Sequence, residues 1–168
     1  MSRHGLHGLL ALLLAIGVAG PAHARGGTLL FHATLTGEQE VPEVESPAHA
    51  RALAQFDSGF TRLRVAVDIR GPLTVVAAHF HCGRPGTNGP VVFGILNPGP
   101  LVEIGNRVRV TLDNSAFTGA DCTEIVGRPV NNVAALALAM RDGLIYINLH
   151  SPDNPTGEIR GQMLELGR

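Results

Sequence analysis

Several residue types are absent or rare in this chain of 168 residues. It contains no Lys and no Trp, one Tyr and two Cys, and only 16% of its residues are charged. The absence of lysine amines excludes mechanisms built on a Schiff base or on a phosphate-loop lysine. The formal net charge of −1 argues against nucleic-acid binding, since that function needs a basic face. Function therefore has to come from His, Arg, carboxylate or backbone groups.

The chain has one long apolar run, and it lies at the N-terminus. Residues 1–24 begin with a basic group at Arg3, continue through apolar residues 9–19 and end in Ala22-His23-Ala24. This pattern is typical of a secretory signal, and the run is shorter than the roughly 20 apolar residues of a membrane-spanning helix. We therefore expect an exported protein, periplasmic or secreted, whose residues 25–168 form a single domain without a membrane span.

The two cysteines, Cys82 and Cys122, are candidates for a disulfide, because compartments beyond the cytoplasmic membrane are oxidising. The alternative is a thiolate metal ligand, because Cys82 directly follows His81.

The rest of the chain consists of short alternating segments separated by turn residues. In residues 61–69, for example, the alternate residues from Leu63 to Ile69 are apolar. One segment, residues 131–143, has helical spacing instead, with Asn residues able to cap its start and Gly143 its end. We therefore predict an all-β protein, an antiparallel Greek-key-like β-sandwich or barrel with one short helix. The predicted strands are residues 28–35, 51–56, 61–69, 73–81, 91–96, 107–112, 144–150 and 158–166.

Three histidines are candidates for a metal site. His79 and His81 are two positions apart on a predicted strand, so both leave the same face, and His150 ends another strand. If these strand ends are neighbours, three imidazoles converge, and imidazoles without carboxylates suit copper or zinc. The alternative is that these histidines are partly exposed and bond to turn backbones.

Other polar residues have simpler interpretations. We expect His32 on the surface; His49 is placed in a loop, with a surface position favoured over a role as fourth metal ligand. We predict that the acidic residues 38–45 form a solvated loop, because they lack the regular spacing of a calcium-binding loop. Arg160 is expected to form a cross-strand ion pair, or else to guide a small anion toward the histidines. Sequence motifs of serine hydrolases, zinc proteases and phosphate-binding loops are absent.

Three runs of residues together resemble the CHRD (chordin) domain family. They are residues 37–42 (GEQEVP), residues 78–83 (AHFHCG) and the closing run from Tyr146 to Gln162, which contains YINLH and NPTGEIRGQ. The resemblance extends from about Leu29 to Leu166. It implies an exported binding domain, since chordin in animals binds and sequesters bone morphogenetic proteins, whereas bacterial members have no settled role.

A fainter resemblance is to copper–zinc superoxide dismutase. In that family, a strand His-x-His pair and a late-strand His bind copper, and an Arg in the final segment steers superoxide. By position, His79, His81 and His150 match the copper ligands and Arg160 the guiding Arg. The bridging His and the zinc-site cluster are missing, which implies a lone copper ion if the site is loaded.

Three functions follow as hypotheses. The first is an exported CHRD-type module that binds a single copper ion through His79, His81 and His150. The second is a copper-dependent, superoxide dismutase-like oxidoreductase that uses Arg160. The third is a metal-free module for adhesion or for binding a protein partner outside the cytoplasm, in which the histidines are structural.

Overall fold

The alternating segments form nine antiparallel strands in a computed structural model that describes residues 28–96 and 106–167. The predicted secretory signal, residues 1–24, lies outside the described residues. The strands are β1 Leu30–Thr36, β2 His49–Phe56, β3 Leu63–Arg70, β4 Ala77–Cys82, β5 Val91–Leu96, β6 Arg107–Leu112, β7 Ile145–His150, β8 Ile159–Gln162 and β9 Leu164–Glu165. The helical elements are α1 Thr123–Val126, a single turn, and α2 Val133–Arg141, with short 3₁₀ turns at Gly37–Gln39 and Asn114–Ala116.

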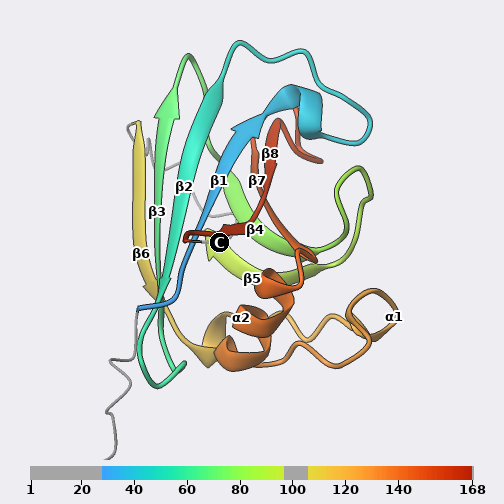
Figure 1. Cartoon of the computed structure of the whole chain (residues 1–168). Coiled ribbons are helices and arrows are strands. Elements are labelled where there is room, and N and C mark those ends of the chain that lie inside the picture. The colour runs from blue at the N-terminus through green and yellow to red at the C-terminus, as the bar shows by residue number, and fades with distance from the viewer. Residues whose placement is uncertain (1–27, 97–105, 168) are drawn as a thin grey trace, which may run out of the picture.

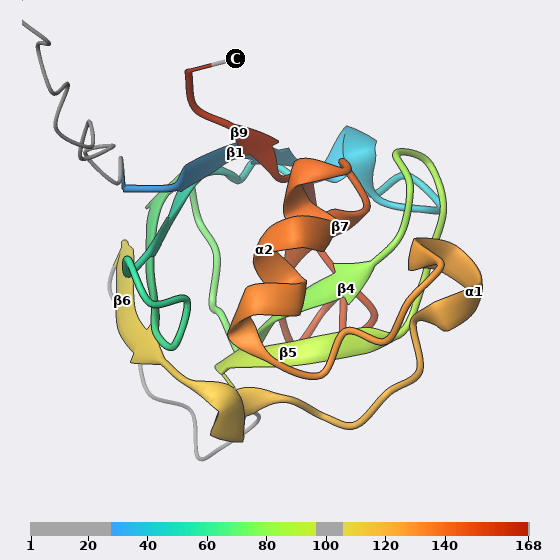
Figure 2. The same cartoon turned by 60° about the horizontal axis from the view of Figure 1, so that its bottom comes forward.

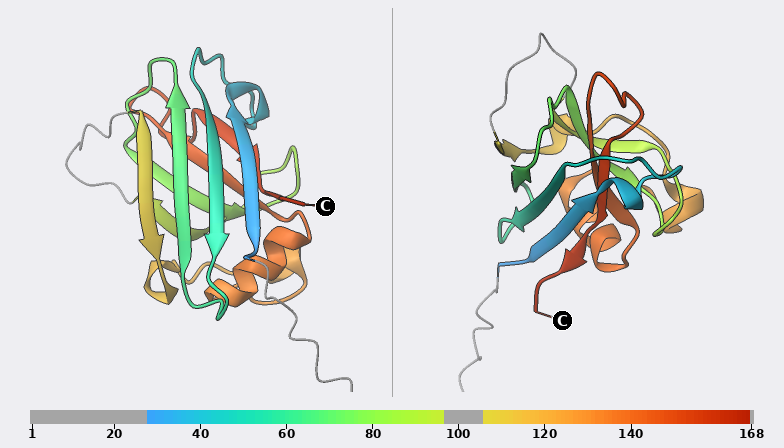
Figure 3. Two further views of the ribbon diagram at one scale, coloured as in Figure 1. Left: turned by 60° about the vertical axis from the view of Figure 1, so that its left-hand side comes forward. Right: turned by 90° about the horizontal axis from the view of Figure 1, so that it is seen from above.

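The strands form one sheet in the order β5-β4-β7-β8-β1-β2-β3-β6, and β9 pairs with β1. The sheet curls into a nearly closed barrel, as the views in Figure 1 and Figure 3 show. Several neighbours, such as β4 and β7 or β8 and β1, are far apart in the sequence. The strand pairs are antiparallel, which confirms the predicted all-β antiparallel fold. The strand order also brings strands from both halves of the chain into contact.

Strand alternation determines what fills the barrel. In β3, every second side chain from Leu63 to Ile69 is buried, and the intervening ones point outward. Helix α2 covers the end of the barrel that is at the bottom of Figure 1 and comes forward in Figure 2. Its Leu136 and Met140 side chains are fully buried. The Asn132 side chain accepts a hydrogen bond from the Ala135 backbone N–H at the start of α2, so the expected Asn cap is confirmed.

The structure corrects three details of the expected elements. β4 begins at Ala77, four residues after the predicted start. The predicted strand of residues 158–166 is divided at Met163, whose fully buried side chain separates β8 from β9. His49, expected in a loop, is the first residue of β2, because its backbone lies in register between Thr36 and Arg70 of the adjacent strands. In the described ranges, no helix is both long and apolar enough to span a bilayer.

Candidate metal centre

The polar residues singled out in the sequence lie on the outer face of three adjacent strands, β4, β7 and β8. Alternation points Ala78 and Phe80 of β4 into the core and turns His79 and His81 outward. The antiparallel register then places outward-facing side chains directly opposite one another. One row is His79, Asn148 and Arg160, and the next is His81, Tyr146 and Gln162.

Two loops cover this outer face, so its polar side chains are buried even though they point away from the barrel core. The Arg160 side chain donates to the Thr87 carbonyl (2.7 Å) and to Asn88 Oδ1 (3.1 Å), both in the loop between β4 and β5. Gln162 Nε2 donates to the Gly83 carbonyl at the start of that loop (3.0 Å). Asn88 Nδ2 donates to the Val41 carbonyl (2.6 Å), which links this loop to the one between β1 and β2. The result is a polar layer shielded from solvent.

The structure brings the three predicted histidines together. Their available ligand atoms all lie within 4.8 Å of one another. His79 Nδ1 is 2.9 Å from His150 Nε2. His81 and His150 are buried, and His79 is half-buried. These residues come from β4 and β7, whose pairing places the His-x-His strand beside the strand that ends in His150.

Backbone carbonyls determine the tautomers of two of these rings. His81 Nδ1 lies 2.9 Å from the Gly89 carbonyl oxygen, and His150 Nδ1 lies 3.0 Å from that of Pro155. Since a carbonyl oxygen only accepts, both Nδ1 atoms carry the proton, and both Nε2 atoms keep their lone pairs. His81 Nε2 is buried and, within residues 28–96 and 106–167, makes no hydrogen bond of normal geometry, although the Asn148 side chain lies beside the ring. This unused buried lone pair beside two other imidazoles is what a metal ion would satisfy, so the residues fit a metal.

The electrostatics keep the cluster neutral. Burial, together with smaller effects of the neighbouring His150 and His81, lowers the pKa of His79 to about 4. The pKa of His81 is also lowered, chiefly by burial. Burial likewise lowers the pKa of His150, against the effect of its hydrogen bond to Pro155. At neutral pH all three rings are uncharged, which is the form that binds a metal ion.

The Arg160 side chain is fixed by contacts within the protein, and the Tyr146 ring lies between it and His81. The Tyr146 ring stacks on His81, with ring centroids 4.8 Å apart and planes 12° apart. Arg160 Cζ lies 3.4 Å from the Tyr146 ring centroid, and β7 is between β4 and β8. Arg160 is 2% exposed. Its expected cross-strand ion pair is wrong, because loop oxygens and an aromatic ring satisfy the guanidinium instead, and no ion pair within the described ranges involves it.

The sequence analysis missed two residues beside this cluster. Glu40, expected in a solvated acidic loop, is buried, and its Oε1 atom has no hydrogen-bond partner among the described residues. Burial raises its pKa to about 7, although the Arg160 charge acts in the opposite direction. Asn148, whose side chain lies beside His81, is also buried, and its Oδ1 makes no hydrogen bond of normal geometry with any described residue. Both residues lie in the runs that resemble the CHRD family, and that was the signal available in the sequence.

Glycine at position 157 lets these groups approach one another. A Cβ atom there would lie 2.6 Å from Glu40 Oε1 and 2.8 Å from Asn148 Nδ2, and the backbone has a φ of +141°. Only glycine accommodates both this close approach and this backbone conformation.

The remaining histidines stay outside the cluster. His49 is exposed at the start of β2, and His32 is half-buried on the outer face of β1. Neither belongs to the group of three whose ligand atoms converge. The surface position favoured for His49 agrees with its exposure.

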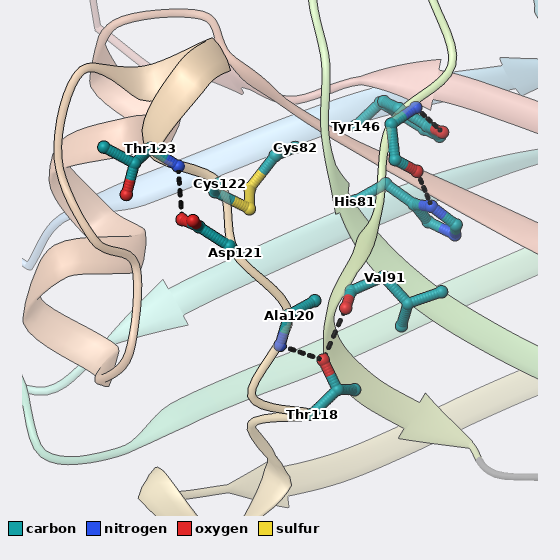
Figure 4. The surroundings of a disulfide bond; sticks show 10 residues. His81, Cys82, Val91, Thr118, Ala120, Asp121, Cys122, Thr123 and Tyr146 are labelled. Carbon is teal, nitrogen blue, oxygen red and sulfur yellow. Dashed lines mark hydrogen bonds between the residues drawn. A yellow bond between two sulfur atoms is a disulfide. The ribbon is translucent and has the colours of Figure 1, made fainter.

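Cys82 and Cys122 form a disulfide, as the export hypothesis predicted. Cys82 is the last residue of β4, next to His81, and Cys122 directly precedes α1 (Figure 4). Both residues are buried. Because its sulfur is bonded to Cys122, Cys82 does not serve as a thiolate ligand, and the disulfide instead fixes the strand end that carries His81.

Comparison with known proteins gives one match. A family model described as the CHRD domain matches residues 31–163, which covers most of the chain. No curated protein and no solved structure matches it.

Proposed function

The chain belongs to the CHRD domain family, and from this premise we propose that it is an exported CHRD-domain protein that binds a single copper ion through His79, His81 and His150. The observation that carries the proposal is the buried Nε2 of His81, which has no hydrogen-bond partner of normal geometry in the described part of the chain and belongs to a group of converging imidazoles. Leaving a buried polar atom without a partner costs about 1–3 kcal/mol, and a bound metal ion would remove that cost.

The donor set favours copper or zinc over the alkaline-earth ions. Three neutral imidazoles offer nitrogen ligands, whereas magnesium and calcium prefer carboxylate, carbonyl and water oxygens. Glu40 and Glu158 are the buried carboxylates among the described residues, and neither is part of the converging group. Copper is chosen over zinc because the His-x-His pair and the late-strand His resemble the copper ligands of superoxide dismutase.

The residues around the cluster would hold the ligands in place. The Gly89 and Pro155 carbonyls orient the His81 and His150 rings, and Tyr146 packs on the face of His81. The covering loops keep water from the buried ligands, and the half-buried His79 provides the side from which an ion enters. When bound, copper supplies a redox-active centre; the chain itself supplies the neutral nitrogen ligands.

Binding is favoured over superoxide dismutase-like catalysis because of Arg160. A guiding arginine needs donors that face incoming anions, but Arg160 donates to Thr87, Arg84 and Asn88 and is buried. A copper-binding or copper-sequestering role needs no such residue.

An extracytoplasmic location fits this role. The disulfide and the CHRD family are both consistent with an extracellular protein. We propose that residues 1–24 direct export and that residues 25–168 form the mature domain.

The test is a titration of residues 25–168 with Cu(I) and Cu(II). The His79→Ala/His81→Ala variant removes two ligands, and His32→Ala/His49→Ala is the matched control that removes two histidines outside the cluster. We expect tight one-to-one binding by the wild type and the control and its loss in the ligand variant. Equal binding by all three proteins, or no binding by any, would contradict the proposal. A metal-free adhesion or partner-binding module would then remain, to be sought by pull-down.

A further inference from the structure

Arginines gather on a face of the barrel far along the sheet from the histidine cluster. Strands β2, β3 and β6 contain five Arg and one Asp, although the whole chain has 13 Arg and 14 acidic residues. All five side chains are exposed, because alternation turns them away from the core. Figure 3 (left) shows these strands side by side, facing the viewer. This arginine face consists of Arg51, Arg64, Arg70, Arg107 and Arg109.

Among the described residues, these five arginines have one acidic residue on the same face, Asp68, which lies opposite both Arg51 and Arg107. Asp68 forms an ion pair with Arg107. Within residues 28–96 and 106–167, no ion pair involves the other four arginines. Like charges without counter-charges repel one another, so this arrangement does not contribute to the stability of the folded protein. An anionic partner would relieve this repulsion.

The face also has a hollow bordered by two of these arginines. Its volume is about 280 Å³, and its lining includes Arg64, Arg109, Leu53 and Ala66. Ala66 lies directly between Leu53 of β2 and Arg109 of β6, so its small side chain leaves room at the centre of the face. An anionic group seated there would meet guanidinium groups on two sides.

We infer that the arginine face binds an acidic polysaccharide through the carboxylate or sulfate groups of successive sugars. Guanidinium groups pair with planar, two-oxygen anions through two parallel hydrogen bonds. Neighbouring strands lie about 4.8 Å apart, and outward side chains repeat about every 6.8 Å along each strand. The arginines therefore present charge at regular intervals over an open surface, as a linear polyanion requires.

Other polyanions fit this face less well. Phe, Tyr and Trp are absent from the outward positions of β2, β3 and β6, whereas single-stranded nucleic acids are bound by stacking on aromatic rings. Leu53 is the only large apolar side chain exposed on these strands, too little to insert into a lipid surface. The disulfide also points to a compartment outside the cytoplasm, where acidic polysaccharides occur.

The experiment measures binding of the mature protein to immobilised polygalacturonate and dextran sulfate, with neutral dextran as the reference surface. The Arg64→Gln/Arg109→Gln variant removes the hollow's charges. The matched control, Arg128→Gln/Arg141→Gln, removes two arginines outside the face that pair with Asp142 and Glu165. We expect binding to at least one acidic polymer to weaken about tenfold in the face variant and to stay unchanged in the control. Wild-type binding should also weaken as salt is added.

Three outcomes would overturn the inference. They are equal weakening in both variants, no preference for acidic polymers over neutral dextran, and binding only to phosphatidylglycerol vesicles or oligothymidylate. Thermal unfolding of each variant shows whether it is folded, and Arg51→Gln/Arg70→Gln provides a second face variant if the first is not. Because this surface is separate from the histidines, the copper titration and the polymer measurement succeed or fail independently.

Discussion

The Nδ1 atom of His79 lies 2.9 Å from the Nε2 atom of His150, although 71 positions separate the two residues in the sequence. The Pro155 carbonyl holds the proton of His150 on Nδ1, so His150 Nε2 accepts and His79 Nδ1 donates. A metal ion that used both nitrogens would displace this shared proton. The pairing thus forms the metal-free state of the proposed site.

Replacing His150 should abolish tight copper binding. The His150→Asn variant removes one of three ligands, and we expect the affinity for copper to fall at least ~100-fold, since even the loss of supporting groups costs 10–100-fold. Isothermal titration of wild type and variant measures the change. His32→Asn, outside the cluster, should bind like the wild type, and an unchanged affinity of His150→Asn would exclude this residue as a ligand.

Acidification should destabilise the metal-free protein through the histidines. The pKa of His79 is about 4 when folded, against 6.5 for an unperturbed His, so between these values the unfolded chain binds more protons. The histidine contribution to the free energy of unfolding therefore falls as pH drops from 6.5 toward 4. Urea unfolding near neutral pH and at about pH 5 should show a smaller loss for His79→Gln than for the wild type. An equal loss in both proteins would contradict the assignment.

Glu40 should make the folded protein less stable as the pH rises, which is opposite to the effect of the histidines. Its pKa is raised from 4.5 to about 7, so the folded state holds the proton more tightly, and the carboxylate costs stability as pH rises through this range. Glu40→Gln should raise the free energy of unfolding above pH 7 by on the order of 1–3 kcal/mol and change it little below pH 4.5. Glu38→Gln, in the exposed part of the same loop, is the control. A destabilised Glu40→Gln at alkaline pH would show that the ionised carboxylate is needed.

The disulfide should account for a large part of the stability. Cys82 and Cys122 close a loop with a sequence separation of 40. The loss of this constraint in Cys82→Ala/Cys122→Ala is expected to lower the free energy of unfolding by about 4 kcal/mol. Chemical denaturation of the oxidised wild type and the variant measures this. A difference below about 1 kcal/mol would show that the unfolded chain gains little freedom when the bond is absent.

Arg160 should contribute to the stability of the fold and not to the attraction of anions. In Arg160→Gln, three loop oxygens lose their donor, and the expected loss is about 2–4 kcal/mol of unfolding free energy. Arg84→Gln changes an exposed side chain in the same loop and should have little effect. Thermal and urea unfolding compare the two variants. Wild-type stability in Arg160→Gln would mean that the guanidinium does not hold the loop.

Much of the fold was determined locally by the sequence. Period-two alternation located the strands, as in residues 61–69, because a half-buried strand needs one apolar face. Asn132 and Gly143 marked the limits of the helix for the same local reason, since the cap satisfies free backbone groups. His79 and His81 were known to share a face because their spacing on a strand requires it.

The way these segments meet depends on contacts between residues that are distant in the sequence. The pairing of β4 with β7 places His150 beside the His-x-His strand, and no local pattern encodes which distant strands are neighbours. The covering loops bury Arg160 on a face that alternation alone marks as outward and solvated, and Glu40, which belongs to one of these loops, is buried as well. Burial depends on what folds over a surface, and this is why the sequence did not reveal the buried positions of Glu40, Asn148 and Arg160.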